Sequence, residues 1–284
     1  GILSTVGDTP LIPLRRVLSN RRVRIYGKLE FFNPGGSIKD RSALSILQEA
    51  LDSGEVVPGD RVIESSSGNM AIGLAQICRF HGLQLVVVVD PKLNAATARI
   101  LAAYGAEVEV VTEPLGDGGF LGARLKRVEE LVNEHRPDGR NFWPNQYRNV
   151  KNPIAHLTTM REIVDAMGEA PDYVFIATST CGTLMGCADY LSSIRAETKI
   201  VAVDAAGSVI FGGATGERKI PGHGAGCRSH FLDPSVCHSV ERVSDRDCVK
   251  GCHRLMDREA ILAGGSSGGV TTAAERYFHR ERVP

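Results

Sequence analysis

The sequence lacks an excess of charge of either sign, because Lys and Arg together number 33 and Asp and Glu together also number 33. A balanced chain has no electrostatic reason to bind nucleic acid or an anionic membrane surface. It also lacks a long hydrophobic run. The longest aliphatic stretch, Leu85 to Val89, is bounded by Gln84 and Asp90, which makes it far too short to cross a bilayer. We therefore expect neither nucleic acid nor a membrane as a partner.

Paired cysteines are missing as well. The seven cysteines are an odd number, and no two of them form a C-x-x-C pair. Scattered thiols of this kind favour a reducing cytosol over a disulfide framework, so we expect a cytoplasmic protein. Cys248 and Cys252 lie beside His253 in a helical pattern, but no second half of a metal site accompanies them. Core packing is the better interpretation, and we expect no metal.

What the chain does contain is a regular alternation of short β-branched runs with helical patterns, which is typical of an open, largely parallel α/β sheet. Its 284 residues correspond to about two domains. The polar segment His135–Arg140 is a plausible seam between two sheets. The expected strands are Val23–Leu29, Arg61–Glu64, Leu85–Val89, Val108–Thr112, Tyr173–Ala177 and Ile200–Asp204. The expected helices are Ile38–Ser53, Asn69–His81, Ala95–Tyr104, Phe120–Glu134, Ile154–Met167, Thr183–Ser193, Asp245–Arg258 and Gly268–Arg280.

A lysine stands where the first expected strand turns into a helix, within Asn33–Arg41 (N-P-G-G-S-I-K-D-R). Pro34, Gly35 and Gly36 break the chain between the two elements. In the first turn of a helix the positive end of the macrodipole disfavours an ammonium, and a neutral amine is what Schiff-base formation requires. Lys39 is therefore a candidate for such chemistry, although the turn by itself fits a solvated surface lysine better.

Four further loops lie where ligands of open α/β sheets bind, at the carboxyl ends of strands. Glu64–Met70 (E-S-S-S-G-N-M) offers hydroxyls and backbone N–H groups that suit a carboxylate, with an ordinary N-cap cluster as the alternative. Ser179–Thr183 (S-T-C-G-T) can cradle a phosphate at a helix N-terminus, but it is not a Walker loop, since no lysine follows the glycine. The other two loops, Pro221–Gly226 and Ala263–Gly269, are rich in glycine.

Together with Lys39, these loops resemble one family, the fold-type II pyridoxal-phosphate enzymes, and within it the cysteine synthase and cystathionine β-synthase group. The similarity runs from Val6–Leu11 (V-G-D-T-P-L) to Ile261–Gly268 (I-L-A-G-G-S-S-G), in the family's order. The resemblance implies an α/β fold of two open, mostly parallel α/β/α sandwich domains like that of the tryptophan synthase β-subunit. It also implies pyridoxal 5′-phosphate as the cofactor and a homodimer. In this arrangement residues 11–140 form a smaller, mobile domain on the substrate side, and residues 1–10 with 141–284 form the larger cofactor-binding domain.

The resemblance also implies roles for single residues. Lys39 carries the internal aldimine and acts as the general base, Asn69 bonds the phenolic oxygen of the cofactor, and Ser266 faces the pyridine nitrogen. The cofactor's phosphate is held by Ser179, Thr180, Cys181, Gly182 and Thr183. The family's phosphate loop is similar to G-T-G-G-T, so this chain places side chains where glycines usually stand. The implied substrate contacts are Ser66, Ser67, Gly68, Met70, Gln146 and Gly222.

Three more stretches, Trp143–Tyr147, Val203–Gly212 and Asp117–Arg124, resemble a narrower group, the N-(2-amino-2-carboxyethyl)-L-glutamate synthases. This similarity implies O-phospho-L-serine as the first substrate and L-glutamate, attacking through its α-amine, as the second. The reaction is a β-replacement that passes through aminoacrylate, releases phosphate and shows ping-pong kinetics. Its product leads to 2,3-diaminopropionate for siderophores such as staphyloferrin B or for peptide antibiotics.

The second substrate distinguishes the relatives from one another. Glutamate brings carboxylates that need cationic or hydroxyl partners when they lose water, whereas sulfide needs none. Arg124, Tyr147 and Ser179 are the candidates carried over from the narrower group, while a helical arginine is otherwise a solvated surface residue. Arg228 and Lys219 are weaker candidates for the leaving phosphate, and His223 has no assigned role. The open alternatives are a cysteine synthase using O-acetylserine or O-phosphoserine, a serine or threonine dehydratase, and a non-catalytic binding or regulatory member of the family.

Overall fold

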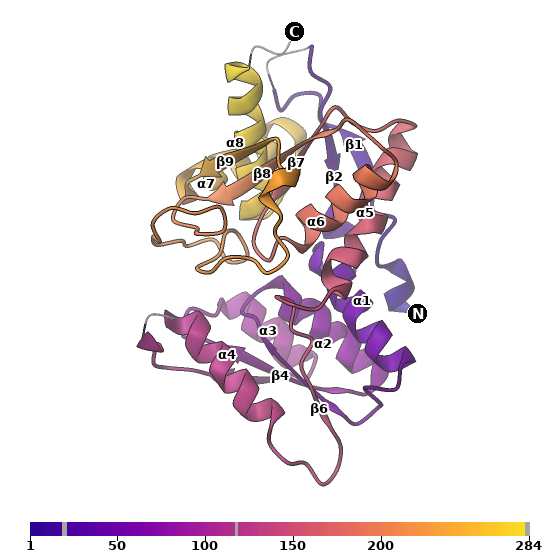
Figure 1. Ribbon diagram of the computed structural model, residues 1–284, viewed down its shortest axis with the longest axis vertical. Coiled ribbons are helices and arrows are strands. Elements are labelled where there is room, and N and C mark those ends of the chain that lie inside the picture. Colours follow the sequence, from indigo (N-terminus) through magenta and orange to yellow (C-terminus); the bar gives the residue numbers. More distant parts are fainter. Residues whose placement is uncertain (19–21, 117–118, 282–284) are drawn as a thin grey trace. The chain divides into compact units, whose positions relative to one another are not determined.

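The computed structural model describes residues 1–18, 22–116 and 119–281. Contacts within the chain divide it into two compact units (Figure 1). Unit 1 consists of Gly1–Gly7 and Phe31–Asn152, and unit 2 consists of Asp8–Glu30 and Pro153–Pro284. The predicted α/β class with mostly parallel sheets is confirmed in both units.

Unit 1 is built on a parallel four-stranded sheet in the order β5-β4-β3-β6. Its strands are β3 (Arg61–Ser65), β4 (Gln84–Val89), β5 (Glu107–Val110) and β6 (Asn141–Phe142). Its helices are α1 (Lys39–Asp52), α2 (Asn69–His81), α3 (Ala95–Ala103) and α4 (Gly119–Val132). A 3₁₀ turn, η1 (Ile2–Thr5), opens the chain, and another, η2 (Glu30–Phe32), precedes the turn to α1.

The run of apolar residues in β4 packs on both faces of this sheet. Leu85, Val87 and Val89 belong to the core that the sheet forms with α1, α2 and α3. Val86 and Val88 belong to a second cluster, together with residues of α4. Successive side chains of a strand point to opposite faces, and helices on both faces of a parallel sheet explain why the whole strand is apolar.

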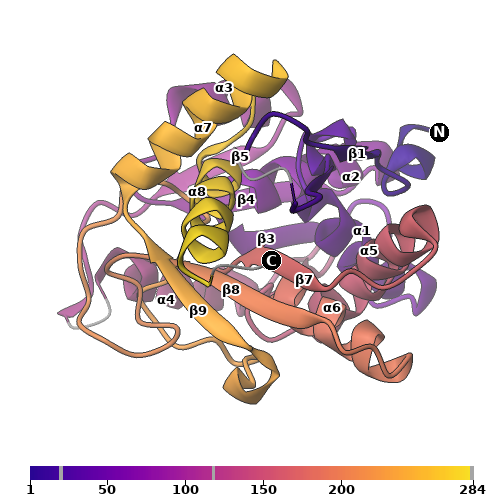
Figure 2. The same cartoon turned by 90° about the horizontal axis from the view of Figure 1, so that it is seen from above.

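Unit 2 is built on a parallel three-stranded sheet in the order β7-β8-β9. Its strands are β7 (Tyr173–Ala177), β8 (Lys199–Ala205) and β9 (Ser239–Val243), and an antiparallel pair is formed by β1 (Leu11–Pro13) and β2 (Tyr26–Lys28). The helices are α5 (Lys151–Met167), α6 (Gly182–Ser193), α7 (Asp245–Glu259) and α8 (Gly265–Arg280), with a 3₁₀ turn, η4 (Pro234–Val236). The first two residues of α5, Lys151 and Asn152, belong to unit 1. Residues of α5 and α6 pack on one face of this sheet, and residues of α7 and α8 pack on the other (Figure 2).

Two glycines allow α7 and α8 to approach each other backbone to backbone. A Cβ added to Gly251 would collide with the carbonyl oxygen of Gly268, and one added to Gly268 would collide with that of Cys248. Any side chain at these two positions would therefore push the helices apart. The close approach fixes the first turn of α8, which carries Ser266.

Several boundaries differ from those expected. The expected strand Val23–Leu29 shortens to β2, and β9 was not anticipated because its sequence S-V-E-R-V is short and half charged, as suits an edge strand. The segment His135–Arg140 joins α4 to β6 inside unit 1, since β6 pairs with β3. The unit bounds therefore differ from the expected 11–140 and 141–284, and the roles assigned to those domains stay predictions. Among the described residues, no helix has both the length and the apolar character that a bilayer crossing requires.

Candidate active site

Lys39 is the first residue of α1, as the glycine breaker predicted. Three hydrogen bonds contribute to the turn before it: the backbone N–H of Lys39 donates to Ser37 Oγ at 3.2 Å, that of Gly35 donates to Asp40 Oδ2 at 2.6 Å, and that of Gly36 donates to Asn33 O at 2.8 Å. Gly36 adopts a φ of +87°, a left-handed conformation that glycine tolerates best. The N–P–G–G sequence thus places the half-buried lysine at the very start of the helix.

The loop Ser65–Gly68, which we call the serine loop, leads from β3 into α2. Ser66 is buried and accepts a hydrogen bond from the backbone N–H of Gly68 at 3.4 Å. Ser65 is buried as well, and its Oγ makes no hydrogen bond within the described part of the chain. A buried hydroxyl without a protein partner suits a polar ligand. Asn69, the first residue of α2, is exposed, and Met70 is buried behind it.

Glu64, to which the sequence analysis gave no role, supports the serine loop by hydrogen bonding. It is fully buried, with Oε1 accepting the N–H of Ser65 at 2.8 Å and Oε2 accepting the N–H of Gln146 at 3.2 Å. Burial raises the pKa of Glu64 to about 7, although these bonds and the charge of Arg124 act to lower it. The signal available in the sequence was an acidic residue, Glu64, directly after the apolar residues Val62 and Ile63 of an expected strand.

Four helices that begin with expected site residues share one feature. Within the described residues, α1, α2, α6 and α8 begin without a side-chain cap. In contrast, Asn94 caps α3, and Ser244 with Asp247 forms a capping box at α7.

In α1 the N–H groups of Lys39, Asp40 and Arg41 are nevertheless bonded within the preceding turn, and the N–H of Gly182 in α6 donates to Thr180 Oγ1 at 3.4 Å. A helix start without an N-cap side chain can still bind an anionic ligand, which suits the expected sites at α2, α6 and α8.

The expected phosphate loop, Ser179–Thr183, leads from β7 into α6 in unit 2. Cys181 precedes α6 with a φ of +64°, a left-handed conformation that glycine adopts more easily than cysteine. Its side chain packs in a buried cluster with Ile210 and Ala225. Thr180 is buried, and the hydroxyl of Thr183 lies 3.2 Å from His156 Nε2. The uncapped helix start and these hydroxyls fit the phosphate of the implied cofactor.

The glycine-rich loop Pro221–Gly226 is tied to the phosphate loop. The N–H of Gly224 donates to Thr178 O at 2.7 Å, and Ser179 Oγ donates to Gly224 O at 3.3 Å. Gly222 is exposed, with a φ of +74°. The bond from Ser179 orders the loop and does not exclude a further contact with a ligand, because a hydroxyl also accepts.

His223, which had no assigned role, pins this loop to the sheet. It is almost completely buried, with Nε2 lying 3.1 Å from Val203 O and Nδ1 lying 3.7 Å from Cys248 Sγ. Burial lowers the pKa of His223 and favours the neutral ring. The network assigns the proton to Nε2, which donates to Val203 O, and leaves Nδ1 to accept from the thiol. This histidine is a structural group of unit 2.

Ser266 lies in the first turn of α8, because the helix begins at Gly265 and not at Gly268 as expected. It is half-buried. Besides the contact with α7 described above, the hydroxyl of Thr272 donates to Asp247 O at 2.9 Å and joins the same two helices. The sequence prediction missed the helix start because glycines at 264, 265, 268 and 269 disguise it.

Arg124 lies on α4 and is not the solvated surface residue that its sequence context allowed. Its Nε lies 3.5 Å from Asp90 Oδ2, and only 13% of its side chain is exposed. The same nitrogen donates to Phe120 O at 3.4 Å. Asp90, at the carboxyl end of β4, also accepts the N–H of Lys92 at 2.9 Å. Residues 117 and 118 of the motif Asp117–Arg124 lie outside the described residues.

Tyr147 contributes to a small hollow of about 180 Å³ in unit 1, whose other lining residues are Leu125, Glu129, Trp143, Asn145 and Arg148. Leu125 follows Arg124 on α4, so the hollow adjoins the helix that carries the arginine. Gln146, next to Tyr147, is buried, and its Nε2 donates to Ser65 O at 3.4 Å. The two candidates for the leaving phosphate, Arg228 and Lys219, are exposed in unit 2.

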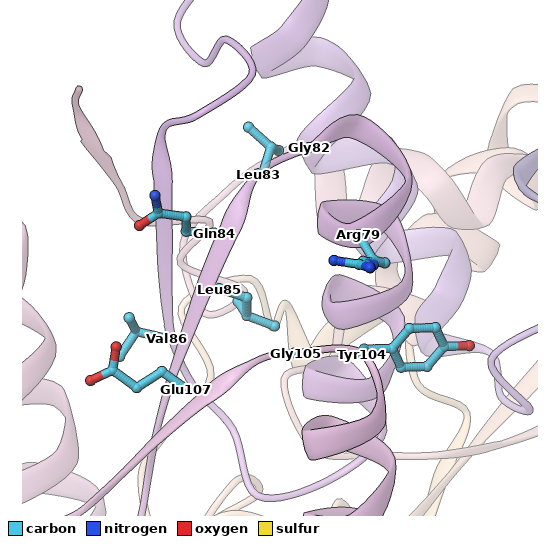
Figure 3. A pocket seen from close by; sticks show the side chains of 9 residues that line it. All are labelled: Arg79, Gly82, Leu83, Gln84, Leu85, Val86, Tyr104, Gly105 and Glu107. Carbon is cyan, nitrogen blue, oxygen red and sulfur yellow. The ribbon is translucent and has the colours of Figure 1, made fainter. Parts of the chain in front are cut away.

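A second hollow, of about 370 Å³, lies at the amino ends of β4 and β5 in unit 1. It includes Gln84 and Glu107, the first residues of these two strands. Figure 3 shows Arg79 and Tyr104 on one side of the strand and Gln84 and Glu107 on the other. These polar groups do not converge on one point. Ligands of parallel sheets bind at the carboxyl ends of the strands, so this hollow is separate from the candidate site.

Residues 2–284 match the family model described as pyridoxal-phosphate dependent enzyme, and the chain belongs to this family. Over 284 residues it is 41% identical to an N-(2-amino-2-carboxyethyl)-L-glutamate synthase from Ralstonia nicotianae, with 100% of this chain and 83% of the relative covered. Over 283 residues it is 39% identical to a protein of the same name from Cupriavidus metallidurans, with 99% and 82% covered.

Solved structures agree with this assignment. A hydrogen sulfide-producing enzyme from Fusobacterium nucleatum superposes with a TM-score of 0.89 at 33% identity, covering 99% of this chain and 93% of that one. An O-acetylserine-dependent cystathionine β-synthase from Helicobacter pylori superposes with a TM-score of 0.86 at 30% identity, covering 100% and 90%. The fold-type II architecture is confirmed, the protein is an enzyme, and pyridoxal 5′-phosphate is its cofactor.

Proposed function

We propose that the protein is an N-(2-amino-2-carboxyethyl)-L-glutamate synthase. The bond between Cβ and the phosphate oxygen of O-phospho-L-serine breaks, and the α-amine of L-glutamate forms a bond to Cβ and loses a proton. The observation that carries the proposal is the full-length similarity to two synthases of this name. The mostly buried Arg124 supports it, because glutamate needs a cation for its carboxylates and sulfide does not.

In unit 1, Lys39 Nζ takes the proton from the substrate Cα and later returns it. The hydroxyls and N–H groups of Ser66, Ser67 and Gly68 bind the substrate carboxylate at the start of α2, with Met70 and Gln146 completing this side of the site. Arg124 and Tyr147 bind glutamate. Bound pyridoxal phosphate supplies the electron sink for removal of the Cα proton.

In unit 2, the phosphate loop Ser179–Thr183 holds the cofactor's phosphate, and Ser179 and Gly222 also face substrate. Ser266 offers a neutral hydroxyl to the pyridine nitrogen, while Asn69 of unit 1 bonds the phenolic oxygen. A hydroxyl cannot balance a protonated nitrogen as an aspartate would, which favours loss of the β-phosphate over other outcomes at Cα.

The wider setting follows from the same assignment. We propose a cytoplasmic homodimer whose product feeds the synthesis of 2,3-diaminopropionate for a siderophore or an antibiotic. The absence of paired thiols in the sequence supports the cytoplasm.

The proposal is tested by incubating the holoenzyme with O-phosphoserine and either glutamate or sulfide, and identifying the products by mass spectrometry. We expect a glutamate adduct and one phosphate per adduct, and O-acetylserine in place of O-phosphoserine serves as the control for the leaving group. Cysteine formed without any glutamate adduct would instead establish a cysteine synthase. That second candidate is supported by the likeness to a cysteine synthase from Entamoeba histolytica, which superposes with a TM-score of 0.86 at 32% identity, covering 95% of this chain and 79% of that one.

A further inference from the structure

A series of buried, hydrogen-bonded polar residues runs through unit 1. Its members are Ser42 on α1, Glu64 on β3, Gln146, and Asn152 on α5, and each is no more than 6% exposed. Side chains of this polarity are costly to bury unless they are hydrogen-bonded. Hydrogen bonds that join all four residues, two of them through the backbone of Gln146, therefore mark a network rather than incidental burial.

The contacts form a continuous path. Ser42 Oγ donates to Asn152 Oδ1 at 2.8 Å, and Asn152 Nδ2 donates to Gln146 O at 2.7 Å. The N–H of Gln146 donates to Glu64 Oε2 at 3.2 Å, and Glu64 Oε1 accepts the N–H of Ser65 at 2.8 Å. A parallel contact runs from Gln146 Nε2 to Ser65 O at 3.4 Å. We call the path from Ser42 through Asn152 and Gln146 to Glu64 the polar relay.

The ends of the polar relay lie at the two parts of unit 1 that carry the proposed chemistry. Ser42 follows Lys39 by three residues on α1, so the two lie about one helical turn apart and on neighbouring positions of the helix surface. Ser65 is the first residue of the serine loop. The relay therefore connects the helix of the proposed proton carrier to the loop of the proposed substrate carboxylate site.

Glu64 is the member whose presence is hardest to explain by packing. A buried carboxylate costs more than an apolar side chain of the same volume, so stability alone does not favour it. An apolar residue would leave the buried N–H groups of Ser65 and Gln146 without their acceptor. The carboxylate is the group that can accept both at once and so hold two chain segments in register.

We propose that Glu64 is a positioning residue of this enzyme, which sets the shape of the serine loop and, through the polar relay, its register with Lys39. The inference rests on the proposed roles of Lys39 and the serine loop, and it does not depend on the identity of the second substrate. It assigns to Ser42 and Asn152 a function in catalysis although neither touches the substrate.

The test uses the holoenzyme and its first stage alone, measured as the absorbance change of the bound cofactor after mixing with O-phosphoserine in a stopped-flow instrument. Glu64→Gln keeps the size of the side chain, but its amide nitrogen cannot accept a backbone N–H. We expect the concentration of O-phosphoserine at half-maximal rate to rise by roughly ten- to a hundredfold, as one buried donor loses its partner.

Ser42→Ala cuts the other end of the polar relay without touching the serine loop. We expect the maximal rate of the first stage to fall about threefold to tenfold, with little change in half-saturation, because the register of Lys39 is affected and the loop is not. Ser53→Ala is the matched control, since Ser53 follows the same helix and its hydroxyl donates to Ala50 O at 3.2 Å. It should behave as the unmodified enzyme.

The double variant decides whether the two ends are connected. A relay predicts that the two substitutions together lower the ratio of maximal rate to half-saturation concentration by less than the product of their single effects on that ratio, while independent sites predict the product. Multiplying effects, or folded variants with unchanged half-saturation and rate, would overturn the proposal. If Glu64→Gln does not fold, Asn152→Ala carries the same test, and unchanged kinetics there would overturn it too. A first stage that behaves as expected but yields no glutamate adduct would refute the proposed function and leave the relay standing.

Discussion

In each unit a fully buried carboxylate lies near the carboxyl end of a central strand, Glu64 on β3 and Asp204 on β8. Each accepts the N–H of the next residue, at 2.8 Å from Ser65 and at 2.9 Å from Ala205. Their remaining bonds differ. Glu64 uses its second oxygen for Gln146 N, whereas Asp204 Oδ1 also accepts Thr178 Oγ1 at 3.2 Å. Within the described residues, Asp204 Oδ2 accepts no hydrogen bond.

The difference indicates two kinds of loop support. Glu64 joins two chain segments and thereby the serine loop, which we propose binds substrate. Asp204 fixes Thr178, the residue before the phosphate loop, which we propose binds the cofactor. Variants of Glu64 and the serine loop should therefore alter turnover and substrate affinity, while variants of Asp204 should alter retention of pyridoxal phosphate. The following predictions test that division.

Lys39→Ala should have the largest effect, because it removes the proton carrier from unit 1 and leaves the phosphate loop of unit 2 intact. We expect product formation to fall by about 10² to 10⁴-fold, and the phosphate loop to retain part of the cofactor after gel filtration although the expected covalent bond to Lys39 is lost. Lys126→Ala, an exposed lysine on α4, is the control. Mass spectrometry measures product formation, and absorbance measures the bound cofactor. An active Lys39→Ala enzyme would refute the assignment of Lys39 as the proton carrier.

Arg124→Ala should separate the two stages within unit 1. We expect the first stage with O-phosphoserine to proceed normally, while the efficiency of the glutamate stage falls roughly tenfold to a hundredfold through loss of a charged hydrogen-bond donor. Arg127→Ala serves as the control on the same helix, because Arg127 pairs with Glu130 at 3.1 Å. Equal loss in both stages would mean that Arg124 supports the fold of unit 1 and not the binding of glutamate.

Much of this organisation was accessible from the sequence. The run Leu85–Val89 was correctly predicted as a strand, and the glycine breaker placed Lys39 correctly in the first turn of a helix. The support of the loops was not accessible, because the partners of Glu64 lie far along the chain, at Gln146. For the same reason the role of His223 escaped the sequence, since Cys248 and Val203 become its neighbours only when α7 packs on β8. The start of α8 was missed because local glycine content outweighed a tertiary contact with α7.

The stability of the two units should respond to pH in opposite directions. The pKa of Glu64, about 7 against 4.5 for an ordinary glutamate, means that the native state holds this proton more tightly. The stabilisation that protonation of Glu64 gives the native state is roughly 3 kcal/mol at most. It is complete below pH 4.5 and is lost as the pH rises through 7. In unit 2, partial burial acts to raise the pKa of Asp247, but hydrogen bonds from Arg276 and Ser244 outweigh it and lower the pKa to about 2. That contribution is present above pH 3.8 and is lost as the pH falls through 2.

Urea titrations between about pH 4.5 and 8 compare the unmodified enzyme with Glu64→Gln and with Asp247→Asn. Glu64→Gln should flatten the loss of stability between pH 4.5 and 7, since a glutamine does not titrate. Asp247→Asn should leave that slope as it is and lower stability throughout this range. A slope that survives in Glu64→Gln would mean that another group releases the proton.

Asp204→Asn should have the smallest effect and sharpens the comparison most. Both hydrogen bonds of Asp204 go to Oδ1, so an asparagine can keep them by presenting its oxygen there and its amide nitrogen at the position of Oδ2. The burial of a charge is then also relieved, which offsets the cost of a new buried N–H donor. We expect the dissociation constant of pyridoxal phosphate, measured by equilibrium dialysis, to change by no more than about threefold. Asp204→Ala, which removes both bonds, should weaken binding further.

Glutamine at position 64 cannot make the same adjustment, because both oxygens of Glu64 accept a backbone N–H. If Asp204→Asn released the cofactor as readily as Asp204→Ala, the second oxygen of Asp204 would have a function in unit 2 like that of Glu64 in unit 1.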